Sequence, residues 1–342
     1  KPQRIDWIDS AKGIGIVLVV IGHTLGGLID SSLGNGLVVP REAFFLIYTF
    51  HMPLFFLLSG LLVSKRVARG TSKFLVGLGP GVVWPYFLWS VIQFTTIYLL
   101  GSLVNNPIQH YWPVILSLPW NTVSQFWFLH ALFWMHVLAA LLLPRIGREG
   151  LVFFALVLKS LMLIVALPVV MKLVFNNMLF YAFGVWLMPA GVEALVVNRG
   201  RLVRIVLLPV LAALVVAATL QALPRFAADL PLLTAASPEI ANLAWRFPAA
   251  AAAVLGTFAV IGVASAFNRP ITGALAFLGR MSMPIFVLHV LFIAGTRIAL
   301  IRFGHIDSVA VLLPLLVLAG LIGPLVTERI TRSLGLNRWI GF

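Results

Sequence analysis

The stretch RIDWIDSAKGIGIVLVVIGH, residues 4–23, starts with charged side chains and then becomes continuously apolar. From Gly13 the run continues to about residue 30, which is long enough to cross the hydrocarbon core of a bilayer. The polar residues before Gly13 lack the form of a cleavable signal peptide. We therefore expect this run to be a retained transmembrane helix.

Apolar stretches of similar length recur along the whole chain. Of its 342 residues, 61% are hydrophobic and 10% are charged, whereas soluble domains carry about a quarter charged residues. This composition predicts an all-α integral membrane protein with a single transmembrane domain over residues 1–342. Pro, Gly and charged residues divide the chain into about ten expected spans. These are 13–30, 43–63, 75–101, 126–143, 151–169, 173–190, 203–222, 247–266, 283–303 and 309–328.

Lysine and arginine are unevenly distributed over the loops that join the expected spans. With the N-terminus inside, 17 of the 24 basic residues fall in inner segments, six fall in outer segments, and Lys159 lies within a span. Basic loops are retained on the cytoplasmic side of a membrane. The asymmetry therefore predicts that both termini are cytoplasmic, and we expect a multi-pass protein of the bacterial inner (plasma) membrane.

The formal net charge of +14 does not indicate nucleic-acid binding, because the basic residues are dispersed over short loops and form no single patch. The chain has no cysteine, which excludes a thiolate nucleophile and a cysteine-based metal site. HExxH, GxSxG and Walker sequences are also missing. We expect no metal ion and no nucleic-acid partner.

The first span carries a basic residue and a histidine on one face. Lys12 and His23 are eleven residues apart, which corresponds to about three helical turns and ~16 Å of rise. Lys12 then lies at the cytoplasmic mouth, where its ammonium can hold a phosphate, and His23 lies near mid-membrane, where a neutral imidazole can act as a base. Coenzyme A thioesters are long enough to join the two. The alternative is that Lys12 is a charge anchor and His23 only packs.

A second histidine lies in the next expected span, in the sequence FHMPLFFLLSG, residues 50–60. His51 enters from the outer side and reaches about the depth of His23. It can therefore face His23 across a shared cavity as a second catalytic residue, with Pro53 loosening the helix beside it. The alternative is a simple helix kink with a packing histidine.

Further aromatic and polar side chains are candidates for an acceptor pocket. Trp127 and His130 lie in QFWFLHALF at the outer end of the fourth span, His289 ends GRMSMPIFVLH, and Glu42 begins the second span. Rings can stack on sugars, and polar groups can bind their hydroxyls. Aromatic residues also form the interfacial belt of membrane proteins, and that alternative stays open.

Five sequence elements, in order, resemble the membrane-bound acyltransferase 3 family, and within it the fucose 4-O-acetylase-like branch. They are RIDWIDSAKG at residues 4–13, the Lys12-to-His23 spacing, FHMPLFFLLSG around His51, WFL at residues 127–129, and LGRMSMPIFVLH ending at His289. The spacing alone is a weak signal, whereas five elements that span nearly the whole chain are specific.

The resemblance implies a ten-helix enzyme that passes an acyl group, usually acetyl, from cytoplasmic acyl-CoA to a hydroxyl of a cell-surface glycan. It implies that His23 is catalytic, that Lys12 helps to bind the donor, and that His51 holds the family's second-span position. Family members often have an Arg-rich approach to the third span. The basic candidates for contact with the CoA phosphates in this sequence are Arg4, Lys65, Arg66 and Lys73.

We therefore expect an acetyl-CoA-dependent O-acyltransferase that modifies an exopolysaccharide, a surface glycan or its lipid-linked precursor. Its expected partners are acyl-CoA, a glycan or lipid-linked oligosaccharide acceptor, the lipid bilayer and polysaccharide assembly proteins. Two alternatives stay open. One is a glycan or solute transporter, which the missing internal repeat and missing in-span acids disfavour. The other is a non-catalytic scaffold of a polysaccharide assembly complex.

Overall fold

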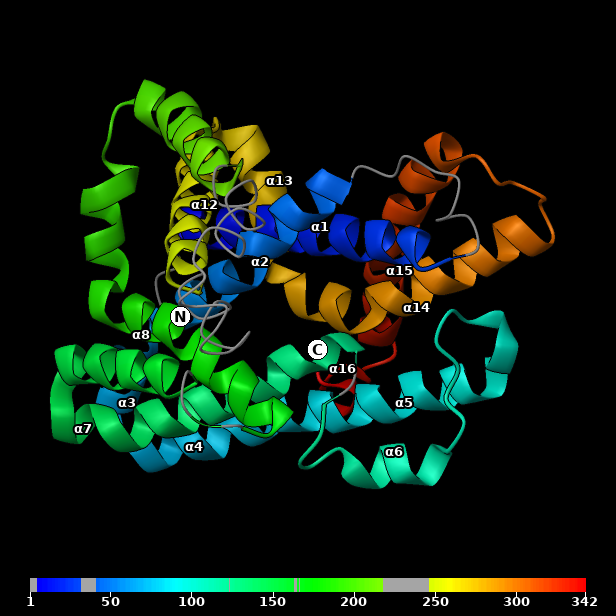
Figure 1. The fold of residues 1–342 in the computed structure, drawn as a ribbon, viewed down its shortest axis with the longest axis horizontal. Coiled ribbons are helices and arrows are strands. Elements are labelled where there is room, and N and C mark those ends of the chain that lie inside the picture. The colour runs from blue at the N-terminus through cyan, green and yellow to red at the C-terminus, as the bar shows by residue number, and fades with distance from the viewer. Residues whose placement is uncertain (1–4, 32–40, 123, 163–164, 166, 218–245) are drawn as a thin grey trace, which may run out of the picture. The chain divides into compact units, whose positions relative to one another are not determined.

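Every regular element in the described residues of the computed structural model is a helix (Figure 1). The structure describes the chain except residues 1–4, 32–40, 123, 163–164, 166 and 218–245. The longer helices are α1 (Asp6–Ile29), α2 (Arg41–Gly60), α5 (Trp84–Leu100), α7 (Trp127–Leu161), α8 (Val169–Val192), α12 (Arg246–Ala266), α14 (Ser282–Arg302) and α15 (Val309–Ser333). The shorter helices are α3 (Val63–Ala68), α4 (Thr71–Leu78), α6 (Tyr111–Ser117), α13 (Arg269–Arg280) and α16 (Asn337–Ile340).

Eight helical stretches in the described part of the chain are long and apolar enough to cross a membrane. They confirm the all-α, multi-pass class that the composition predicts. The expected span 126–143 and residues 151–161 of the expected span 151–169 fall in the single stretch Ser124–Leu161. The expected span 203–222 begins with the shorter helix Val203–Ala217, and its last five residues lie outside the described residues. These two differences account for the gap between eight stretches and the ten expected spans.

Helix α7 is broken at Gly147, whose backbone has a φ of 69°. This left-handed conformation favours glycine, and Pro144 precedes it within the helix. The two arms of α7 correspond to the fourth and fifth expected spans. The second arm ends at Leu161, earlier than expected, and Pro168 precedes α8 as its N-cap. Proline disfavours helix at the residue before it, so Leu167 does not continue into α8 as helix.

The chain divides into two compact units. The first consists of Lys1–Gly15, Tyr48–Phe74 and Trp134–Gly279, and the second of Ile16–Ile47, Leu75–Phe133 and Arg280–Phe342. Helices α1, α2, α4, α7 and α13 contribute residues to both units. A single transmembrane domain over residues 1–342 stays a prediction.

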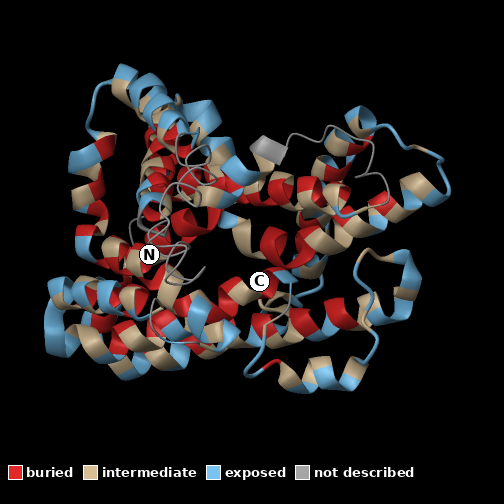
Figure 2. Cartoon of the chain, in the orientation of Figure 1, coloured by how far each residue is buried: buried red, intermediate tan, exposed pale blue. Residues whose placement is uncertain are grey.

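Helix α2 passes through the core of the first unit. Residues 51–58 are buried at every position (Figure 2), as expected for a helix with neighbours on all sides. Close packing against α8 depends on two glycines. A Cβ at Gly60 would lie 2.2 Å from the Tyr181 carbonyl oxygen, and a Cβ at Gly184 would lie 2.1 Å from the Leu57 carbonyl oxygen. The two backbones therefore touch without intervening side chains.

The first half of α1 is held in the first unit by the same kind of contact. A Cβ at Gly13 would lie 2.0 Å from the carbonyl oxygen of Leu275 in α13, and a Cβ at Gly279 would lie 1.8 Å from that of Asp9. Glycine at both positions lets α1 and α13 cross in backbone contact. The crossing fixes the helix at the residue that follows Lys12.

Two side-chain hydrogen bonds hold the first turns of α1. The Trp7 indole N–H donates to the Glu193 carboxylate at 3.1 Å, and the Ser10 hydroxyl donates to the Thr272 carbonyl oxygen at 3.2 Å. Glu193 follows α8 and Thr272 lies in α13. The segment before Lys12 is therefore tied to two other helices of its unit.

In the second unit, α15 packs along α14 and also meets the second half of α1. A Cβ at Gly320 would lie 2.9 Å from side-chain atoms of both Val20 and Ile293, so glycine permits this three-helix contact. Another face of α15 exposes large apolar side chains at intervals of three and four residues, which places them in one stripe. They are Leu315, Leu318, Ile322, Val326 and Ile330. Such a stripe is typical of contact with lipid chains.

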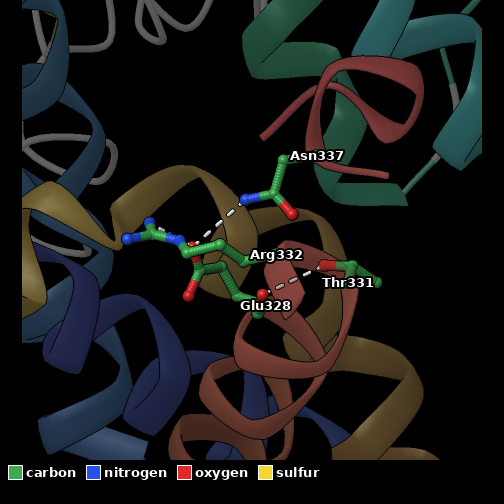
Figure 3. Close-up of polar contacts among 4 residues, drawn as sticks. All are labelled: Glu328, Thr331, Arg332 and Asn337. Carbon is green, nitrogen blue, oxygen red and sulfur yellow. Dashed lines mark hydrogen bonds and ion pairs between the residues drawn. The ribbon is translucent and has the colours of Figure 1, made fainter. Parts of the chain in front are cut away.

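The end of α15 is joined to α16 by a buried carboxylate (Figure 3). Glu328 pairs with Arg332 and accepts a hydrogen bond from the Asn337 amide at 3.3 Å. Two indole N–H groups of α5 hold α16 in place. Trp84 donates to the Trp339 carbonyl oxygen at 2.7 Å, and Trp89 donates to that of Ile340 at 2.8 Å.

Replacing Gly13 with alanine is expected to lower the thermal stability of the protein. The new Cβ would meet a main-chain carbonyl that can move only if α13 moves, and such overpacking costs about 1–3 kcal/mol. Gly273→Ala in α13 is the matched control, because open space surrounds Gly273 and alanine favours a helix by about 1 kcal/mol over glycine. Thermal unfolding in detergent measures both variants. A Gly13→Ala melting temperature at or above that of the native protein contradicts the crossing.

Candidate active site

Two histidines from different helices meet in the second unit. The ring centroids of His23 in α1 and His289 in α14 lie 5.0 Å apart, with the ring planes at 59°. His23 is half-buried and His289 is fully buried. The sequence predicts a functional role for each residue, but the pairing arises only from the packing of α1 against α14.

The backbone of α14 fixes the protonation pattern of His289. Its Nδ1 lies 3.0 Å from the Ile285 carbonyl oxygen and 2.8 Å from the Phe286 carbonyl oxygen. Since a carbonyl can only accept, Nδ1 carries the proton and Nε2 of the neutral ring holds a lone pair. Within the described residues that Nε2 is buried without a hydrogen-bond partner. A buried unsatisfied acceptor costs free energy and calls for a functional explanation.

Apolar side chains surround this pair. Phe286 lies 6.2 Å from His289 between ring centroids and 5.4 Å from Phe128 of α7. The contact among Val20, Ile293 and Gly320 lies nearby. Val20 is about one helical turn before His23 in α1, and Ile293 is about one turn after His289 in α14. Electrostatic interactions strengthen where water is excluded, and this applies here to the fully buried ring of His289.

A second polar cluster fastens the segment before α7. The Tyr86 hydroxyl donates to the Leu118 carbonyl oxygen at 2.7 Å, and His130 Nε2 donates to that of Pro119 at 3.1 Å. Trp127, at the start of α7, is half-buried. His130 thus has a structural contact in addition to its predicted role. A substrate-binding role for Trp127 and His130 stays a prediction.

Two buried glutamines, which were not predicted from the sequence as site residues, form a reciprocal amide pair. Gln93 donates to the Gln125 side-chain oxygen at 3.1 Å, and Gln125 donates back at 2.6 Å. Both side chains are buried. The sequence offers only one signal for this pair, namely a glutamine within apolar α5 and another just before α7. That they pair depends on tertiary contact.

Basic residues of the predicted donor site gather in the first unit. Lys12 is half-buried in α1, whereas Lys65, Arg66 and Lys73 are exposed. The charge of Arg66 acts on Lys12, and Asp9 acts on Lys12 with the opposite sign. Two predicted residues have no described side chain: Arg4 lies outside the described residues, and so does the side chain of Glu42, although its backbone belongs to α2.

His136 is a buried histidine of α7 that was not predicted from the sequence as a site residue. Its Nδ1 lies 2.6 Å from the hydroxyl of Tyr181 in α8, and its ring centroid lies 5.4 Å from that of Phe74. The charge of Arg66 acts on His136 and on Tyr181. Its sequence signal was a second histidine six residues after His130, within an apolar helix.

His51 is 2% exposed in α2, and its ring centroid lies 4.7 Å from that of Tyr48. It belongs to the first unit, whereas His23 belongs to the second. A catalytic role for His51 and its approach to His23 stay predictions.

Comparison with known proteins shows a match to one protein family. Residues 5–329 match the model of the acyltransferase 3 family, described as an acyltransferase domain. The sequence is 35% identical to nodulation protein NolL of Mesorhizobium japonicum over 137 residues, which are 39% of this chain and 35% of that protein. NolL of Sinorhizobium fredii is 33% identical over 144 residues, 40% of this chain and 35% of that protein. The similarity thus spans about a third of these relatives. No solved structure matches the chain.

Proposed function

The chain belongs to the acyltransferase 3 family, and from that premise we propose that it transfers an acetyl group from cytoplasmic acetyl-CoA to a sugar hydroxyl. The proposed acceptor is an exopolysaccharide, a surface glycan or its lipid-linked precursor. The observation that carries the proposal is the pair His23 and His289, with an unpartnered, unprotonated Nε2 on His289. Two imidazoles at this distance, one half-buried and one fully buried, are suited to handle hydroxyl protons.

In the proposed reaction, His23 removes the proton of the acceptor hydroxyl, and the oxygen attacks the thioester carbonyl carbon. The carbon–sulfur bond breaks, and His23 returns the proton to the CoA thiolate. The products are the O-acetyl ester and free CoA. His289 Nε2 accepts a hydrogen bond from a neighbouring hydroxyl of the same sugar and holds the reacting hydroxyl beside His23. Fixing the two reactants in this way lowers the entropic part of the barrier.

His23→Ala is expected to reduce acetyl transfer by about 10²–10⁴-fold, the usual contribution of a general base. Membranes that contain the native or variant protein are incubated with acetyl-labelled CoA, and label is followed into the glycan and lipid-linked fractions. His110→Ala, which changes an exposed loop histidine, is the matched control and should retain native activity. Equal labelling by native and His23→Ala protein, at equal protein level, would remove His23 from the chemistry and favour a scaffold.

The donor site in this proposal begins at Lys12 and Arg66. Lys12 and Arg66 repel one another electrostatically. An anionic ligand that both cations contact would offset this repulsion. In α1, Lys12 precedes His23 by about 16 Å of helical rise. A CoA thioester with its phosphates at the basic end would extend its acyl group along the helix toward His23.

Lys12→Gln and Arg66→Gln are each expected to weaken acetyl-CoA binding by about tenfold, because each removes a charge-assisted hydrogen bond. Binding of acetyl-pantetheine, which lacks the nucleotide phosphates, should be unaffected. Lys172→Gln, at an exposed lysine of α8, serves as the control. Equilibrium binding to the purified protein measures all three. Unchanged acetyl-CoA affinity in Lys12→Gln would exclude Lys12 from the donor site.

We place the protein in the bacterial inner membrane with about ten spans and both termini in the cytoplasm. The excess of Lys and Arg in alternate loops supports this orientation. A reporter fused after Phe342 is therefore expected to give a cytoplasmic signal. A periplasmic signal from the same fusion would contradict the orientation or the even number of spans.

A further inference from the structure

Arg297 is a buried cation that the proposed chemistry does not use. It lies in α14, is 6% exposed, and donates from Nη1 to the carbonyl oxygen of Gly27 in α1. A charged side chain within a membrane span is costly and marks a functional site by default. Its surroundings therefore need an explanation beyond the packing of two helices.

Capping of α1 is the simplest explanation, since Gly27 lies in the last turn of that helix, where cations are favourable. However, the Asn105 amide also donates to the Gly27 carbonyl oxygen, at 3.0 Å. A carbonyl oxygen has two lone pairs, and a neutral donor already serves this one. Capping alone does not require a buried positive charge.

Most of the hydrogen-bonding capacity of Arg297 remains available. A guanidinium has five N–H donors, and in the described structure only Nη1 is engaged, with Gly27. Among the described residues, the other guanidinium nitrogens of this side chain have no hydrogen-bond partner. Asp30 acts electrostatically on Arg297, but these two residues form no ion pair in the described structure. A planar set of donors and a positive charge are thus open to a ligand.

The guanidinium lies close to the histidine pair along the same two helices. His23 contacts His289, and Gly27 contacts Arg297, so α1 and α14 run in the same direction here. Gly27 is four residues beyond His23, which is about 6 Å of helical rise, or one turn. Arg297 is farther from His289, but a helical side chain leans toward the N-terminus of its own helix, which brings the guanidinium back to the level of Gly27.

We infer that Arg297 binds an anionic group of the acceptor, a carboxylate or a phosphate, while His23 and His289 hold the reacting hydroxyl about one helical turn away. The planar guanidinium matches both groups in bidentate geometry. The inference rests on the proposed function and adds a substrate class, namely acidic or phosphate-linked glycans. The carboxylate would come from a uronic acid, and the phosphate from the linkage of a lipid-linked oligosaccharide.

Equilibrium binding to the purified full chain tests the inference without relying on catalysis. The probes are an oligosaccharide that contains a uronic acid, its carboxyl-reduced form, and a neutral oligosaccharide with and without a polyprenyl pyrophosphate. The native protein should bind at least one anionic probe about tenfold or more tightly than its neutral counterpart. Arg297→Gln, which keeps a donor for Gly27, should abolish that preference. The probe pair whose preference is lost identifies the carboxylate or the phosphate as the source of the anion.

Two comparisons separate this role from capping. Asn105→Ala removes the other donor to Gly27 and should leave the preference for the anionic probe intact, whereas Arg297→Lys should retain only part of it. The inference is overturned if the native protein prefers neither anionic probe, or if Asn105→Ala and Arg297→Gln weaken binding of charged and neutral probes alike. Absence of acetyl transfer in the native protein, with the Arg297-dependent preference intact, would refute the proposed chemistry but not the anion site.

Discussion

The backbone contact between α1 and α13 holds the helix that carries both Lys12 and His23. Gly13 and Gly279 have no side chains to separate the two helices, and the bonds from Trp7 and Ser10 secure the adjacent turns. Because an α-helix has a fixed rise per residue, the separation of Lys12 and His23 along α1 is set by the covalent chain. In the proposed reaction, donor binding at Lys12 and proton transfer at His23 would therefore occur on one helix, and no loop would set their spacing.

Polar side chains inside this protein fall into two groups. Gln93 and Gln125 satisfy each other, and Lys159 donates to the backbone and side-chain oxygens of Asn176 at 3.2 and 3.0 Å. Such contacts remove the cost of burial and hold the helices together. His289 Nε2 and the guanidinium of Arg297 differ, since each keeps hydrogen-bonding capacity that the described structure does not use. The proposed reaction and the proposed anion site both use this unused capacity.

The class of the fold could be predicted from the sequence, because length and apolarity are the main requirements for spanning a bilayer. The break at Gly147 was anticipated as a division between two spans, but the early end at Leu161 was not. For the candidate site, the spacing along one helix placed Lys12 and His23 on one face. The partnership of His23 with His289, and that of His136 with Tyr181, could not be derived, because each joins segments far apart in the chain. Such pairings depend on tertiary packing, on which a single sequence gives no direct information.

The attachment of the last residues to α5 has a consequence for sequence variation. The indoles of Trp84 and Trp89 donate to main-chain carbonyls of residues 339 and 340, which every amino acid possesses. At residues 339 and 340 these two bonds therefore depend on position along the chain and not on side-chain identity, whereas the Phe342 ring also stacks on Trp89 at 5.4 Å between centroids. Substitutions at residues 339 and 340 preserve both acceptors, whereas deletion of one residue between α15 and residue 339 shifts both carbonyls out of register. Natural variants of this segment should consequently drift in composition while conserving its length.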